Sequence, residues 1–112
     1  MIKSKNNAEH YLWGNSCDSW ILKDSESLSV KQELMPSATA EKLHFHHRAE
    51  QFFYILKGEA VFYINDEKYS LKAGESITIL PESKHYISNE SERDLEFLVI
   101  SNPSTNNDRT EV

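Results

Sequence analysis

The chain has 112 residues, of which 38% are hydrophobic and 27% are charged, and its formal net charge is −6. This length fits one domain over residues 1–112, and the apolar content excludes a disordered chain. The acidic excess disfavours DNA or RNA as a partner, because the phosphate backbone is also negative. No apolar run approaches the roughly 20 residues of a membrane helix, and the opening MIKSKNN lacks the apolar segment of a secretory signal. We therefore expect a cytoplasmic protein with neither a membrane nor a nucleic-acid partner.

Apolar residues recur with a period of two in many short runs, and no run longer than ten residues has the spacing of an amphipathic helix. The sequence therefore predicts an all-β protein. In chain order, the expected strands cover residues 20–23, 28–35, 42–46, 51–56, 60–64, 68–71, 76–80, 85–88 and 95–101. Short strands separated by turn residues at this density indicate a sandwich or a barrel.

The two ends of the chain differ from the part between them. Residues 1–12 and 101–112 are polar and lack alternation, which predicts frayed or loosely docked tails. The barrel core is expected at about residues 20–102.

The expected strand at 51–56 is apolar on both faces. Phe53 and Ile55 point to one face and Phe52 and Tyr54 to the other, because successive side chains of a strand alternate. Only one face can point into a barrel. The other must be covered by another sheet, an N-terminal segment or another subunit, and we favour a homodimer.

Three of the five histidines lie in the segment HFHH at 44–47, and a fourth, His85, follows about forty residues later. On a strand, His44 and His46 project to the same face about 7 Å apart, close enough for both imidazoles to reach one metal ion. His47 points the other way and is expected at the rim. His85 begins a later strand and could close the site. The lone cysteine, Cys17, excludes a multi-cysteine zinc site.

A fourth ligand is available from one of two adjacent residues. Gln51 is in register with the inward apolar residues of its strand, so its amide oxygen is expected to face His44 and His46. Glu50 offers a carboxylate, which suits a hard cation better, but it would face the site only if the turn after His46 were distorted. We predict Gln51 as the ligand and keep Glu50 as the alternative.

The segment HFHHRAEQFFYILKG, from His44 to Gly58, resembles the first motif of the cupin family: His-x-His, four residues, an acid or amide, six residues and a glycine. The segment GESITILPESKHYISN, from Gly74 to Asn89, resembles the second motif, in which a histidine follows the glycine by eleven residues and an asparagine comes four later. The resemblance covers about residues 20–102. It implies a double-stranded β-helix, or jelly-roll barrel. It also implies a metal ion in the barrel mouth, held here by His44, His46, Gln51 and His85.

The sequence departs from the family pattern at three positions. Gln51 stands where most metal-binding cupins have glutamate, which leaves a neutral ligand set and an alternative in which His44 and His46 are polar fillers of a barrel without metal. Ala38 and Glu82 stand where the family has glycine. Because a residue without a Cβ is favoured at positive φ, we expect the turn at Glu82 to be reshaped.

Three imidazoles and an amide oxygen suit a divalent Zn, Ni, Fe, Mn or Cu ion and leave an open position for substrate. The resemblance implies an enzyme, such as a dioxygenase or isomerase, acting on a small oxygen-bearing metabolite in the barrel. One alternative is a non-catalytic barrel that binds or senses a small molecule. Another is a relative of sugar-phosphate isomerases, which needs a basic phosphate pocket, and only Arg48 and Lys42 are available to form one. The expected lining of the mouth is Phe53, Ile55, Ile77 and either Lys42 or Gln32. Since the ordinary pKa of histidine is ~6.5, metal affinity should fall on acidification through roughly pH 6.

Overall fold

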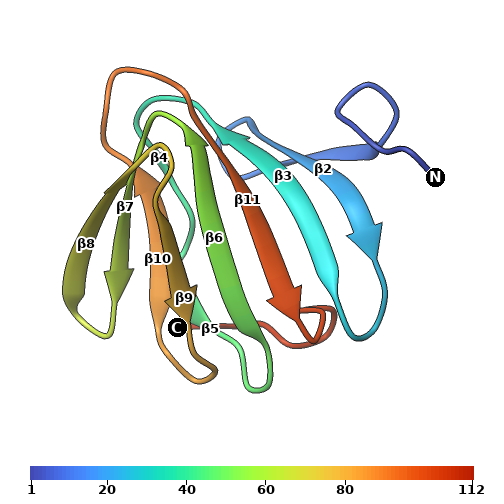
Figure 1. Cartoon of the computed structure of the whole chain (residues 1–112). Helices are drawn as coiled ribbons and strands as arrows, with labels where there is room; N and C mark the ends of the chain where they lie inside the picture. The colour runs from blue at the N-terminus through green and yellow to red at the C-terminus, as the bar shows by residue number, and fades with distance from the viewer.

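The computed structural model describes all 112 residues, and it contains strands and turns but no helix (Figure 1). The prediction of an all-β protein is therefore confirmed. The strands are β1 (Glu9–Trp13), β2 (Cys17–Asp24), β3 (Ser29–Met35), β4 (Thr39–Ala40), β5 (His44–Phe45), β6 (Glu50–Lys57), β7 (Glu59–Ile64), β8 (Glu67–Lys72), β9 (Ser76–Ile79), β10 (His85–Asn89), β11 (Leu95–Asn102) and β12 (Thr110–Glu111). No helix with the length and hydropathy to cross a membrane is present.

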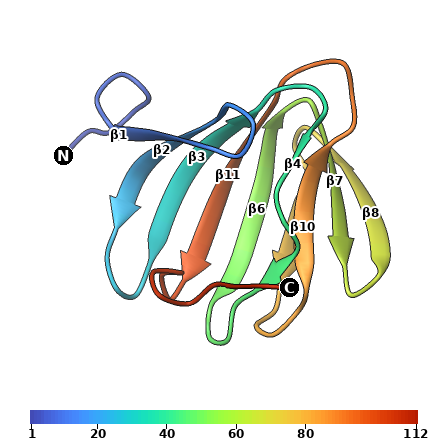
Figure 2. The ribbon, with the colours of Figure 1, turned by 180° about the vertical axis from the view of Figure 1, so that it is seen from behind.

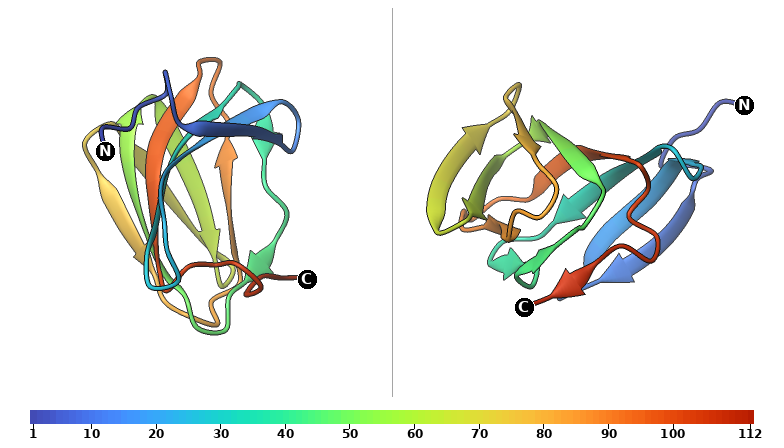
Figure 3. Two further views of the ribbon diagram at one scale, coloured as in Figure 1. Left: turned by 90° about the vertical axis from the view of Figure 1, so that its right-hand side faces the viewer. Right: turned by 90° about the horizontal axis from the view of Figure 1, so that it is seen from below.

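Two antiparallel sheets face each other and enclose the core (Figure 3). The first has the order β1-β2-β3-β11-β6-β9, and the second has the order β12-β5-β10-β7-β8, with β4 beside β10. Several strands that are consecutive in the chain, such as β5 and β6, lie in different sheets. This antiparallel, sheet-switching arrangement is the predicted double-stranded β-helix, or jelly roll.

The core lies between the sheets, where alternate residues of the central strands point inward. Phe53 and Ile55 of β6 are buried, as the alternation predicts, whereas Tyr54 is 38% exposed on the outer face. The ring of Phe53 packs against Phe62 and Phe97, with centroid distances of 4.9 and 5.6 Å. The register of β6 is therefore fixed by its apolar inward face.

The prediction of loose tails is wrong for parts of both ends. At the N-terminus, β1 pairs with β2 in a regular antiparallel ladder. At the C-terminus, the chain leaves β11, turns, and runs across to pair β12 with β5 (Figure 2). Both are edge strands, and ladder hydrogen bonds form between backbone groups whatever the side-chain pattern. Alternation alone therefore missed them.

Two turns keep a left-handed backbone although a side chain stands where the family has glycine. Ala38 has φ 61° and Glu82 has φ 71°, so the expectation of a reshaped turn at Glu82 is wrong. The Glu82 amide donates to the carbonyl of His46 at 2.7 Å, which ties this turn to the histidine segment.

Candidate metal centre

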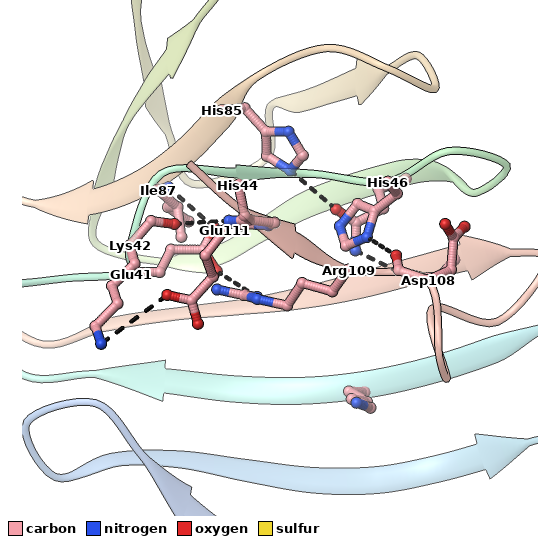
Figure 4. A network of polar contacts seen from close by, with 12 residues as sticks. Glu41, Lys42, His44, His46, His85, Ile87, Asp108, Arg109 and Glu111 are labelled. Atoms are coloured by element: carbon pink, nitrogen blue, oxygen red, sulfur yellow. Dashed lines mark hydrogen bonds and ion pairs between the residues drawn. The ribbon is translucent and has the colours of Figure 1, made fainter.

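Three buried histidines meet at one end of the barrel (Figure 4). His44 lies on β5, His46 follows that strand directly, and His85 begins β10, where it is the register partner of His44. One ring nitrogen from each histidine lies within 4.8 Å of the others. The sequence prediction that His85 joins the pair from the first motif is therefore correct in geometry.

Each of these histidines has its Nδ1 atom next to a backbone carbonyl. The acceptors are Lys42 for His44 at 2.7 Å, Ser83 for His85 at 2.8 Å, and Asp108 for His46. A carbonyl oxygen can only accept, so each Nδ1 carries the ring proton. Each Nε2 therefore keeps a free lone pair, which is the form of imidazole that binds a metal.

The side chain of Gln51 brings a further acceptor to this cluster. Its Nε2 donates to the hydroxyl of Ser101 at 3.1 Å, and its Oε1 lies 3.2 Å from the Nε2 of His85. Two acceptors cannot share a hydrogen bond, and the Nε2 of His46 is buried without any partner. Converging lone pairs of this kind suit a cation, so the donor set fits a divalent metal ion. Glu50 is exposed and does not line the cavity that Gln51 lines.

Burial sets the protonation of the histidines. It lowers the pKa of His44 to about 3 and that of His85 to about 4, and it lowers the pKa of His46 as well, since an imidazolium would lose its hydration. The imidazoles are therefore neutral over the physiological range. We therefore expect protons to compete with a metal ion at a lower pH than the value near 6 expected from the sequence.

Glu41, in the segment between β4 and β5, is a titratable group that the sequence analysis missed. Its Oε1 lies 4.0 Å from the Nε2 of His44 and accepts the amide of Ile87 at 3.1 Å, and its Oε2 lies 3.7 Å from a guanidinium nitrogen of Arg109. Burial raises the pKa of Glu41 to about 8, and Arg109 opposes the shift. No sequence pattern marks Glu41, because it lies outside regular alternation.

Asp108 belongs to the tail that was expected to be loose. It is 4% exposed, and its carboxylate accepts the backbone amides of His47, Arg48 and Ala49 at 2.7, 3.0 and 3.0 Å. Burial disfavours its charge, but these three donors outweigh burial and hold the pKa of Asp108 below its usual range. A residue far along the chain thereby holds the segment that carries the first motif.

A cavity of about 630 Å³ opens beside the histidines, within the size range of small-molecule sites. Phe53 and Lys42 line it, as expected, whereas Ile77 does not. Gln32 does not, because it points to the outer face and donates to Glu96 at 2.6 Å, and its neighbours Lys31 and Glu33 line the cavity instead. Ile55 lies wholly in the core. The error arose because inward positions of β3 are polar and therefore give no apolar alternation.

Comparison with known proteins gives one consistent match. The family model described as "Cupin domain" matches residues 30–101. An uncharacterized protein of Methanocaldococcus jannaschii is 31% identical over 84 residues, which are 75% of this chain and 67% of the relative. An oxalate-binding protein of Thermotoga maritima is 35% identical over 66 residues, which are 59% of this chain and 54% of the relative.

Solved structures show the same fold. The structure of TT1209 from Thermus thermophilus has a TM-score of 0.72 and 25% identity, covering 76% of this chain and 81% of that one. A Thermotoga maritima protein described as a "predicted oxalate decarboxylase" has a TM-score of 0.82 and 23% identity, covering 93% and 100%. A nucleoside dehydratase has a TM-score of 0.82 and 20% identity, covering 100% and 90%.

Proposed function

The chain belongs to the cupin family, and on this basis we propose that it is an enzyme that holds one divalent transition-metal ion on His44, His46, His85 and Gln51. Its substrate is a small oxygen-bearing metabolite that enters the cavity beside these residues. The ion is Zn, Ni, Fe, Mn or Cu, all of which accept imidazole and oxygen ligands.

One observation carries the metal proposal: the Nε2 lone pairs of three buried histidines converge, and that of His46 has no partner. A buried acceptor without a partner costs about 1–3 kcal/mol. A metal ion removes this cost. A barrel without metal would instead favour a rotated Gln51 amide that donates to the Nε2 of His85.

The residues around the cluster support catalysis over simple binding. A divalent ion held there would act as a Lewis acid that polarises an oxygen atom of the metabolite. Glu41, beside His44, is the carboxyl group placed to give a proton to a ligand in the cavity or to take one from it. Lys31 and Arg109 bring positive charge to the same cavity, and Glu33 brings a second carboxyl group. These mixed charges give little support to a phosphate pocket.

Elemental analysis tests the metal proposal. Protein purified without chelator, then reconstituted with excess Zn, Ni, Mn or Fe(II), should hold about one ion per chain. The variant His46→Ala should hold much less, and His47→Ala, which removes an exposed histidine, should match the unmodified protein. Occupancy near zero with every metal would refute the proposal.

The substrate class requires a second experiment. Oxalate is the first ligand to test, because a relative is named for binding it, and other small hydroxy and oxo acids follow. We expect metal-dependent turnover of one member of this panel, with Glu41→Gln retaining the metal but losing most of the turnover. Binding without turnover for every tight ligand would favour the non-catalytic alternative.

A further inference from the structure

The last ten residues run across the end of the barrel that carries the histidines, and hydrogen bonds hold them there at several points. The Ser104 amide donates to the carbonyl of Glu26 at 3.0 Å, β12 pairs with β5, and the Val112 amide donates to the carbonyl of Leu43 at 3.1 Å. This segment, 103–112, lies outside the 30–101 range matched by the family model.

The three histidines differ in where their Nδ1 partners come from. His44 and His85 use carbonyls two residues before them in the chain, so their ring orientation is fixed locally. His46 uses the carbonyl of Asp108, which lies 62 residues away. Of the three rings, the one with no local acceptor depends on the C-terminal segment.

The backbone around His46 depends on the same residue. The segment 46–49 lies between β5 and β6 and belongs to neither strand. Asp108 accepts the amides of His47, Arg48 and Ala49 through its carboxylate while its carbonyl holds the His46 ring. Figure 4 shows Asp108 beside His46, on the far side from His85. One buried residue thus fixes both the loop and the ring that the loop carries.

From these contacts we propose that Asp108 is a positioning residue for the metal centre, and that segment 103–112 completes the site by holding His46 with its Nδ1 protonated and its Nε2 turned toward His44 and His85. This inference rests on the proposed metal function. Groups that orient a metal-binding histidine typically change metal affinity by 10–100-fold when they are removed. We expect a loss in that range when the hold of Asp108 is broken.

The test compares Asp108→Ala and Asp108→Asn with the unmodified protein. Asp66→Asn is the matched control, since it makes the same charge change at the exposed turn between β7 and β8. Cobalt(II) is the probe, with affinity measured by competition and site geometry by visible absorption. We expect Asp108→Ala to bind Co(II) 10–100-fold more weakly with an altered spectrum, Asp108→Asn to keep part of the affinity, and Asp66→Asn to show no change.

A second readout works without metal. The ring ¹⁵N shifts of His46 in the metal-free protein report which nitrogen is protonated, and we expect Nδ1–H in the unmodified protein and a shift toward Nε2–H in Asp108→Ala. If the unmodified protein binds no Co(II), the proposed metal function fails, and the ring shifts alone decide the role of Asp108. Folded Asp108 variants with unchanged ring shifts, or with unchanged affinity and spectrum, would overturn the inference.

Discussion

Glu50 and Gln51 are adjacent in the chain and lie on opposite faces of β6. Gln51 is 7% exposed, beneath the histidines, whereas Glu50 lies on the solvent side. Gln51 pairs with Ser101 of β11 and Ile79 of β9 in the ladder, so a central, well-packed strand holds its direction. Strand register, and not ligand strength, therefore decides which of the two residues faces the candidate site.

Single substitutions of Glu50 and Gln51 should separate the effect of strand register from the effect of ligand strength. We expect Gln51→Ala to weaken metal binding by about tenfold, and Glu50→Ala to leave it unchanged. Gln51→Glu should strengthen binding, because it adds a negative charge to a neutral set of ligands. Calorimetric titration of metal into the three variants provides the measurement. A greater loss in Glu50→Ala than in Gln51→Ala would contradict the register.

Most of the site could be predicted from the sequence because its residues alternate. His44 and His46 are two residues apart, which predicts that they share a face, and Gln51 is in register with the buried Phe53 and Ile55 of β6. Asp108 and Glu41 have no such marker. Their roles arise where separate segments meet, and a single sequence carries no pattern that brings residue 108 to residue 46.

The lining of the cavity shows the same limit within a regular strand. Lys31 and Glu33 point inward from β3, where a ligand cavity replaces close packing. Hydrophobic alternation predicts which side chains pack in a core. It does not predict which polar side chains face a cavity, so it left Lys42 and Gln32 as alternatives, of which Lys42 lines the cavity and Gln32 does not.

Acidification should destabilise the metal-free protein through its buried histidines. Their pKa is ~6.5 in the unfolded chain but about 3 for His44 and about 4 for His85 in the fold. Below pH 6.5 the unfolded chain therefore binds protons that the folded protein does not. As a result, the free energy of unfolding decreases as the pH decreases. Urea unfolding from pH 7.5 to 4.5 should show a steeper fall for the unmodified protein than for His85→Gln.

The dependence of the free energy of unfolding on pH must be compared between the unmodified protein and His85→Gln. Glu41, whose pKa is raised by burial, titrates in the opposite sense, stabilising the fold at low pH and less as the pH rises through about 8. This contribution is common to both proteins and cancels in the comparison. Parallel curves for the two proteins would contradict the burial of a neutral His85.

Metal should stay bound at a pH where an exposed three-histidine site would release it. Protons compete with metal for the Nε2 lone pairs, and burial has already disfavoured the imidazolium form of all three rings. We expect occupancy to persist at pH 5 during dialysis without chelator. Release with a midpoint near pH 6 would show that the rings are hydrated in solution.

Gly58 should tolerate no side chain. A Cβ there would lie 2.5 Å from the carbonyl oxygen of Asp94, and φ is +87°. Gly74 has φ +88° with nothing within 4 Å of its Cβ position, so it isolates the backbone cost. We expect Gly74→Ala to lower the free energy of unfolding by about 1 kcal/mol and Gly58→Ala by about 2–4 kcal/mol. Equal losses in denaturant unfolding would mean that β11 moves aside without cost.

The outer face of the first sheet should hold the proposed homodimer together. Phe52 and Tyr54 of β6 are register partners of Ile100 and Leu98 of β11, which places four apolar side chains in one block on that face. Such a block is stabilised when a second subunit removes it from water. Light scattering should therefore give twice the 13.0 kDa mass of one chain.

Substitution should locate the contact. Tyr54→Lys should give a monomer or an aggregate, because a lysine in the centre of the block loses its hydration when the dimer forms. Tyr69→Lys is the control, since Tyr69 is 40% exposed, close to the 38% of Tyr54, but lies on β8 of the other sheet. It should leave the mass unchanged. A dimer that survives Tyr54→Lys but not Tyr69→Lys would move the interface to the second sheet, and a mass of one chain at all concentrations would refute the dimer.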